Sequence, residues 1–162
     1  MPRLVWNIPP ERMKMRLPHR VPLPTQALSL LNELEALTGD GVLLFPSLRT
    51  RDRPMSENTL NAALRRMGFG GDEMTAHGFR AVFSTLANES GLWNPDAIER
   101  ALAHVEKNAV RRAYARGEFW DERVRLAQWW ADFTDVLRFG QSPGERAGMR
   151  WDSDRPSTGS QS

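Results

Sequence analysis

Tyr114 is the only tyrosine of the chain, and it lies in an arginine-rich run. Residues 111–116 read Arg-Arg-Ala-Tyr-Ala-Arg, and His104 precedes the tyrosine by ten residues. Further upstream, His77 and Arg80 are three residues apart, which places them on one face if the segment is helical. A tyrosine hydroxyl can attack a phosphodiester, arginine can neutralise the phosphate oxygens, and histidine can transfer a proton. These residue types are sufficient for metal-free phosphodiester cleavage.

Each of these residues also has an ordinary structural interpretation. A lone histidine after the apolar end of a helix, as at His104, is more often a hydrogen-bonding group than a catalyst. Tyr114 follows Val110 at helical spacing, which is typical of an amphipathic core position. Lys14 lies in a polar loop, where a solvated charge is the default, and His19 is interpreted as structural. Only the ordered combination favours chemistry.

The composition limits the class of protein and its partners. At 162 residues the chain is long enough for one core of ordinary size. Its formal net charge is only +2, but of 22 basic residues only Lys14 and Lys107 are lysines. Clustered arginines grip phosphate in bidentate fashion and hint at a polyanionic partner. A GC-rich genome, whose codons favour arginine, explains the same bias equally well.

Several function classes are disfavoured. The chain has no cysteine, which excludes disulfides, thiolate metal sites and a cysteine nucleophile. Three dispersed histidines without a carboxylate cluster predict neither a zinc site nor a two-metal nuclease, and no cofactor is expected. The N-terminus lacks the apolar run of a signal peptide, and no stretch is long enough to span a membrane. We therefore expect a cytoplasmic protein without a membrane partner.

Two short β-prone segments, 3–8 and 19–23, are bounded by prolines and predict a hairpin with a basic loop. Helical spacing of apolar residues predicts the remaining elements. The expected helices are 25–38 with Thr25 as cap, 56–68 with Ser56 as cap, one starting near Thr75, one starting at Asn94-Pro95, a short one at 110–116 and a long one at 118–138.

The predicted helices also have predicted inner faces. In the helix that starts near Thr75, four residues are expected to point inward: Phe79, Val82, Phe83 and Leu86. In the last helix the spacing selects Leu126, Trp130, Phe133 and Leu137. Residues 1–139 are expected to form one domain. Residues 140–162 contain hardly any apolar side chains and are expected to be a disordered tail.

The ordered motifs resemble the catalytic part of phage-type integrases of the tyrosine recombinase family. The pattern is His-x-x-Arg, then a histidine after Leu102-Ala103, then Ala-Tyr-x-Arg, and the likeness runs from about Trp6 to Leu137. Its supporting segments are 8–14, 18–23, 55–60, 74–80 and 102–114. The resemblance implies a mainly helical catalytic domain with a small N-terminal β-hairpin, lacking the first helices of the family's fold.

The resemblance also implies a division of catalytic labour. Tyr114 would attack a DNA phosphate and form a 3′-phosphotyrosyl intermediate. Arg80 would neutralise charge on the non-bridging oxygens. His77 and His104 would hydrogen-bond the same phosphate, with His77 favoured for proton transfer. Lys14 matches the family lysine that protonates the leaving 5′-oxygen.

Expected partners follow from the same likeness. Double-stranded DNA is the expected ligand, with Arg16, Arg53 and Arg116 as candidate contacts. The C-terminal helix, which carries Trp120, Trp129 and Trp130, is a candidate surface for other integrase protomers.

The chain departs from the family pattern at its start. A first catalytic arginine is expected in a segment resembling Thr-Gly-x-Arg-x-x-Glu, and nothing in residues 1–13 fits it. We therefore expect either an excised piece of an integrase or the product of a truncated gene, with little activity alone. The alternative is an inactive remnant that binds DNA or an intact integrase. An unrelated helical transcription regulator is disfavoured, because Arg65 and Arg66 lie at the wrong end of their helix for groove reading.

Overall fold

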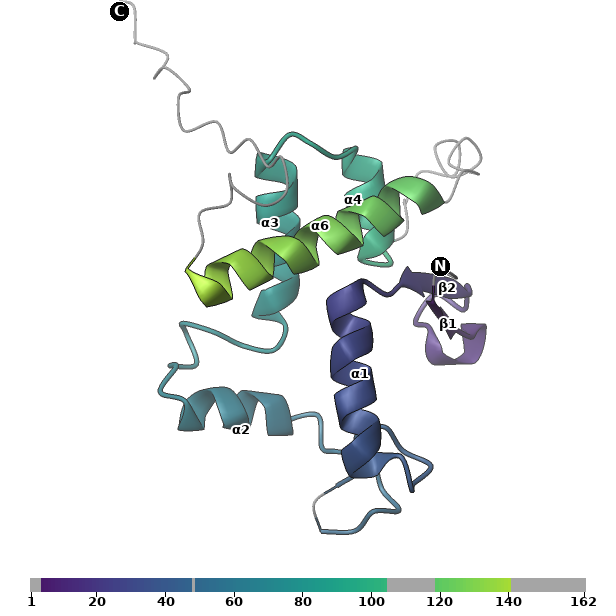
Figure 1. Cartoon of the computed structure of the whole chain (residues 1–162), viewed down its shortest axis with the longest axis vertical. Coiled ribbons are helices and arrows are strands. Elements are labelled where there is room, and N and C mark those ends of the chain that lie inside the picture. Colours follow the sequence, from purple (N-terminus) through teal and green to yellow (C-terminus); the bar gives the residue numbers. More distant parts are fainter. Residues whose placement is uncertain (1–3, 48, 105–118, 141–162) are drawn as a thin grey trace, which may run out of the picture.

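A computed structural model describes residues 4–47, 49–104 and 119–140. In this part of the chain, five α-helices and a two-stranded antiparallel sheet follow one another (Figure 1). The expected fold class, mainly helical with a small N-terminal hairpin, is confirmed. The helix expected at 110–116 and the tail expected at 140–162 lie outside the described residues, apart from Gly140.

The hairpin pairs β1 (Val5–Ile8) with β2 (His19–Pro22), and a short 3-10 turn, η1 (Pro10–Arg12), lies between them. The register sets Asn7 opposite Arg20. The Arg20 guanidinium lies 4.1 Å from the centre of the Trp120 ring, within cation–π range. The Arg123 guanidinium donates to the Arg20 carbonyl. These contacts join the hairpin to α6 (Trp120–Phe139).

The core is formed by three helices: α3 (Gly78–Glu89), α4 (Pro95–Ala101) and α6, which crosses the other two (Figure 1). The Asn94 side chain accepts a hydrogen bond from the Asp96 N–H at 2.9 Å, which confirms the predicted start of α4. The buried residues of this core are Ala87, Ile98, Leu102, Leu126, Trp129 and Phe133. Their contact fixes the end of α4 against the side of α3.

The prediction for the inner face of α3 is half right. Phe83 and Leu86 pack against the core, but Phe79 and Val82 are 56% and 40% exposed. The helix begins at Gly78 rather than near Thr75, and its first turn extends beyond the cover that α4 and α6 provide.

The inner face of α6 also differs from prediction at its C-terminal end. Leu126 and Phe133 are buried and Trp130 packs against the core, as expected. Leu137, however, is 63% exposed, and Val136 is buried instead. Steps of three and four residues both keep to one face of a helix, and packing selected the step of three after Phe133.

The first two helices are α1 (Thr25–Thr38) and α2 (Thr59–Arg66). Neither predicted cap is correct, because the residues in cap position are Pro24 and Asn58. The Thr25 N–H donates instead to Gln128 of α6 at 3.1 Å. Ser56 accepts from the Asn58 N–H at 3.3 Å and thereby forms a turn that precedes α2.

The N-terminal end of α1 is attached to α6 by polar contacts. The Gln26 amide donates to Asp132 at 2.8 Å and to Asp135 at 3.0 Å. Gln128 donates to Gln26 at 2.8 Å, so the amide of Gln26 is bonded at both its donor and its acceptor atoms. α1 contains no fully buried residue. This helix is therefore held to the core mainly at its N-terminal end.

Candidate active site

The turn that leads into α3 is held by two side chains of α2. The Arg65 guanidinium donates to the Met74 carbonyl at 2.6 Å and also to the Phe69 carbonyl. Asn61 accepts from the Ala76 N–H at 2.8 Å. These bonds fix the backbone immediately before His77, so α2 serves as a support for this turn.

His77 and Arg80 lie at the start of α3. His77 occupies the N-cap position, and its carbonyl accepts from the Arg80 N–H at 3.0 Å. Both side chains are exposed. Exposed basic side chains at the start of a helix, where the helix dipole is positive, are favourably placed for an anion.

Arg80 reaches from α3 to the C-terminal end of α4. Its Nη2 atom donates to the Leu102 carbonyl at 2.6 Å and lies 3.4 Å from Nε2 of His104. A guanidinium has five N–H donors. Among the described residues, Nε and Nη1 of Arg80 have no hydrogen-bond partner.

His104 is placed by the way α4 ends. The Ala103 N–H donates to the Arg100 carbonyl at 3.1 Å, and the His104 N–H donates to the Glu99 carbonyl at 2.9 Å. Ala103 adopts a left-handed conformation with φ of 56°. This pair of bonds around a left-handed residue is a Schellman motif, which reverses the chain and turns His104 back toward α3.

The left-handed Ala103 gives a prediction about stability. Such a conformation costs a residue with a Cβ atom about 1–2 kcal/mol, whereas glycine adopts it freely at some cost in unfolded-state entropy. Ala103→Gly should therefore stabilise the chain by about 1 kcal/mol, a rise of about 2–4 °C in melting temperature by calorimetry. Ala101→Gly, at the last residue of α4, should instead destabilise it, because glycine has a lower helix propensity than alanine. A fall in melting temperature for Ala103→Gly would contradict the assigned conformation.

The side chain of His104 is held from two sides. Its Nδ1 atom lies 2.7 Å from a carboxylate oxygen of Glu99, and its Nε2 atom faces Arg80. A carboxylate only accepts hydrogen bonds and a guanidinium only donates them. Both neighbours therefore favour a ring with its proton on Nδ1 and a lone pair on Nε2. Nothing in the residue types alone predicted the involvement of Glu99; its position five residues before His104 was the available signal.

The remaining predicted site residues are not joined to this pair. Lys14 and Arg16 are exposed in the loop between β1 and β2. Within the described residues, no hydrogen bond connects Lys14 or His77 with Arg80 or His104. Tyr114 and Arg116 lie outside the described residues. The structure thus brings together the side chains of Arg80 and His104, and all the catalytic assignments stay predictions.

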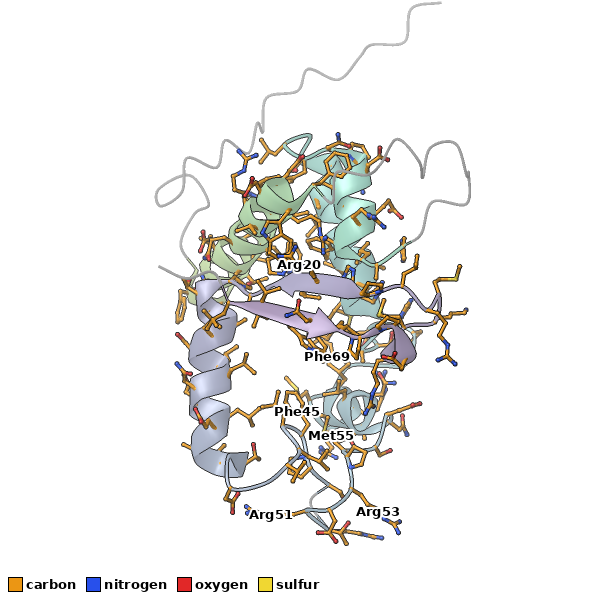
Figure 2. The ribbon with its side chains drawn as sticks, turned by 90° about the vertical axis from the view of Figure 1, so that its right-hand side faces the viewer. Arg20, Phe45, Arg51, Arg53, Met55 and Phe69 are labelled. Carbon is orange, nitrogen blue, oxygen red and sulfur yellow. The ribbon has the colours of Figure 1, made fainter. Side chains whose placement is uncertain are left out.

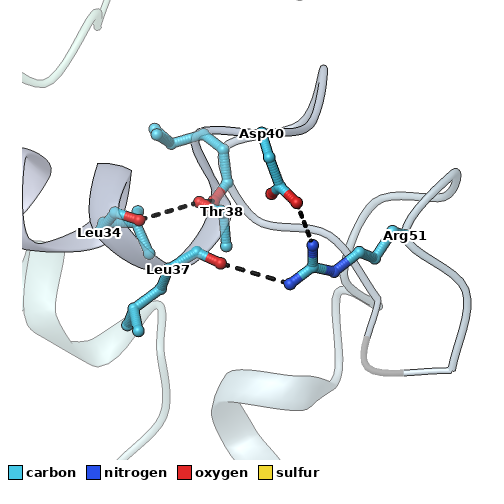
Figure 3. A network of polar contacts seen from close by, with 6 residues as sticks. Leu34, Leu37, Thr38, Asp40 and Arg51 are labelled. Atoms are coloured by element: carbon cyan, nitrogen blue, oxygen red, sulfur yellow. Dashed lines mark hydrogen bonds and ion pairs between the residues drawn. The ribbon is translucent and has the colours of Figure 1, made fainter.

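The arginines of the loop between α1 and α2 differ in their surroundings. Arg51 donates to Asp40 at 2.6 Å and to the Leu37 carbonyl at 3.4 Å, so it ties the loop to the end of α1 (Figure 3). Arg53 is also exposed, and Figure 2 shows it with Arg51 at the end of the molecule beyond α1. No hydrogen bond to another described residue occupies the guanidinium of Arg53.

Metal-binding clusters and membrane-spanning helices were searched for among the described residues. No group of three or more potential metal ligands occurs in 4–47, 49–104 and 119–140. None of the helices described there is both long and apolar enough to cross a membrane.

The helical fold and the Arg80–His104 pair agree with one class of protein. The chain belongs to the phage integrase family, whose model matches residues 2–119, and the resemblance to phage-type tyrosine recombinases is thereby confirmed. Its relatives include the prophage integrase IntA of Escherichia coli K12, 48% identical over 135 residues, which cover 83% of this chain and 32% of IntA. The integrase of Enterobacteria phage P4 is 46% identical over 148 residues, covering 83% and 34% of the two chains.

A less similar relative also matches most of this chain over about a third of its own length. The integrase of Shigella phage Sf6 is 37% identical over 124 residues, covering 76% of this chain and 32% of its own. The chain spans about a third of the length of the curated relatives that it matches. No solved structure matches it significantly.

Proposed function

We propose that this chain supplies the phosphate-binding and nucleophilic part of a tyrosine recombinase active site, which breaks and rejoins DNA at a specific site. The observation that carries the proposal is the meeting of Arg80 and His104, which are 24 residues apart in sequence. Both side chains are exposed, and their nitrogen atoms converge where α3 meets the end of α4. Membership of the integrase family supports the same assignment.

In the proposed reaction the Tyr114 hydroxyl attacks the phosphorus of a DNA backbone phosphate. The bond from phosphorus to the 5′-oxygen breaks, and the protein becomes joined to the 3′-phosphate. The free N–H groups of Arg80 neutralise charge that develops on the non-bridging oxygens. His77 accepts the tyrosine proton, His104 contacts the phosphate, and Lys14 protonates the departing 5′-oxygen. A 5′-hydroxyl from another strand reverses these steps and completes the exchange.

DNA is the proposed substrate, and exposed arginines outside the catalytic pair are the proposed contacts to its backbone. Arg16 and Arg53 support this role because they are exposed and lie in loops that a duplex can reach. Arg116, beyond the described residues, is assigned by the resemblance alone.

Arg53→Ala tests this electrostatic contact. If Arg53 contacts one phosphate, its loss should weaken binding to any duplex and lower the slope of log K against log salt concentration by about 1. Fluorescence anisotropy of a labelled duplex over a salt series measures both quantities. Arg125→Ala, which removes an exposed arginine of α6 outside this loop, is the matched control and should leave the slope unchanged. A salt-independent affinity for the unmodified chain would remove DNA from the proposal.

A second candidate is an inactive remnant that binds DNA or another integrase protomer. Of the tryptophans predicted to form the protomer surface, Trp129 is buried and Trp130 packs against the core. The end of α6 favours the protomer contact instead, because Leu137 and Phe139 are 63% and 65% exposed. Stable binding to DNA or to an integrase without any covalent product would favour this second candidate.

A further inference from the structure

We propose that Glu99 is a positioning residue for His104, a role that neither the family match nor the motif pattern assigns. The proposal builds on the proposed function only in naming phosphate as the group that His104 serves. Its structural part concerns Glu99, which lies in α4, and His104, which lies in the turn that follows α4.

Glu99 and His104 are joined by one backbone hydrogen bond and one side-chain hydrogen bond. The His104 backbone N–H donates to the Glu99 carbonyl at 2.9 Å, and Nδ1 of the ring lies 2.7 Å from the Glu99 carboxylate. The backbone bond fixes the distance between the two residues, and the side-chain bond then fixes the rotation of the ring. A short bond to a charged acceptor is stronger than one between neutral groups.

The part of α4 that carries Glu99 and leads to His104 is anchored in the core. Ile98 precedes Glu99 and is fully buried, and Leu102 is 6% exposed; both belong to the core formed with α6. Glu99 and His104 themselves are exposed, so the ring stands at the surface of a well-packed helix end. Packing thus determines where the pair sits, while the carboxylate determines which way the ring faces.

The consequence of this arrangement lies at the other ring nitrogen. With Nδ1 directed at Glu99, Nε2 is the atom presented to Arg80, and a proton gained at Nε2 makes it a donor to a phosphate oxygen bound beside it. The Nδ1–H bond persists whether the ring is neutral or protonated, so only Nε2 changes when a proton is gained or lost. A histidine whose working nitrogen is set by a carboxylate at the other nitrogen follows the logic of catalytic triads.

Nitrogen NMR on the 162-residue chain tests the proposal without any activity assay. The chain has three histidines, so its ring signals can be assigned with single histidine variants. In the neutral ring, which the nitrogen shifts distinguish from the protonated ring, His104 should carry its proton on Nδ1. Glu99→Ala should shift it toward the Nε2–H form that a free ring favours in water, because the remaining contact with Arg80, at 3.4 Å, is weaker than the lost 2.7 Å bond. Glu99→Gln, whose side-chain oxygen accepts the same bond, should restore the Nδ1–H form.

A matched control separates positioning from a general charge effect. Glu89→Ala removes an exposed carboxylate from the end of α3 and should leave the His104 signals unchanged. If His104 shows the same tautomer in the unmodified chain and in Glu99→Ala, the positioning role is overturned. If Glu99→Ala unfolds, its spectrum will lose signal dispersion throughout. Glu99→Gln then decides the question, because a changed His104 tautomer in the folded Glu99→Gln variant also contradicts the proposal.

Adding a short DNA duplex to the same sample tests the proposed function separately. If phosphate reaches the site, the Nε2 signal of His104 should shift while the Nδ1–H signal persists. No shift at Nε2 would count against the proposed function, and the tautomer comparison would still decide the role of Glu99.

Discussion

Tyr114→Phe is expected to abolish the covalent protein–DNA adduct, because phenylalanine keeps the ring but lacks the attacking oxygen. The measurement uses a chimera, in which this chain replaces the segment of phage P4 integrase that it matches. A nicked suicide duplex carrying that integrase's recombination site traps the adduct, which a denaturing gel separates from free protein. An adduct that persists in Tyr114→Phe would remove Tyr114 from the reaction.

The isolated 162-residue chain provides a second comparison in this assay. Residues 1–13 do not match the segment in which the family's first catalytic arginine is expected. Lack of one preorganised phosphate donor costs roughly 10²–10³-fold in rate. The isolated chain should therefore form adduct at least that much more slowly than the chimera. Efficient Tyr114-dependent adduct from the isolated chain would overturn this expectation, whereas a chimera that binds DNA but forms no adduct would favour the inactive remnant.

Arg80→Ala is expected to slow adduct formation in the same chimera by about 10²–10³-fold. The substitution removes the donors that neutralise the phosphate, together with the 2.6 Å bond to the Leu102 carbonyl. Single-turnover rates at saturating DNA isolate the chemical step from binding. Arg80→Lys keeps the charge without the two-pronged geometry, so its rate should lie between those of Arg80→Ala and the unmodified chimera.

Two controls test whether a slower rate in Arg80→Ala reflects the loss of the Arg80 donors rather than of charge or folding. Arg138→Ala removes an exposed arginine at the end of α6 and should leave the rate nearly unchanged. The thermal unfolding of Arg80→Ala should remain cooperative, because Arg80 is exposed and contributes little to the core. A rate within a few-fold of the unmodified chimera would show that Arg80 does not stabilise the transition state.

The elements that the sequence predicted well depend on local interactions. The start of α4 follows from an asparagine cap before a proline, and the hairpin follows from short β-prone runs bounded by prolines. The proximity of Arg80 to the start of α3 follows from helical spacing alone. Each of these features is decided within a few residues of chain, so a single sequence contains the necessary information.

The family assignment was likewise available from the ordered motifs, and the comparisons confirmed it. The motifs could name Arg80 and His104 as partners of one phosphate. They could not supply the atoms that hold the pair, because the Leu102 carbonyl and the Glu99 carboxylate are common groups with no distinctive sequence signal.

The sequence by itself thus determined the family, the order of helices and the identity of the candidate catalytic side chains. Tertiary structure decided that Val136 rather than Leu137 is buried, that Phe79 is exposed, and that Arg80 meets the end of α4. These outcomes depend on where α4 and α6 cross α3, which results from the packing of side chains distant in sequence. Periodicity identifies an apolar face, but only the packed neighbours decide how far along a helix that face is covered.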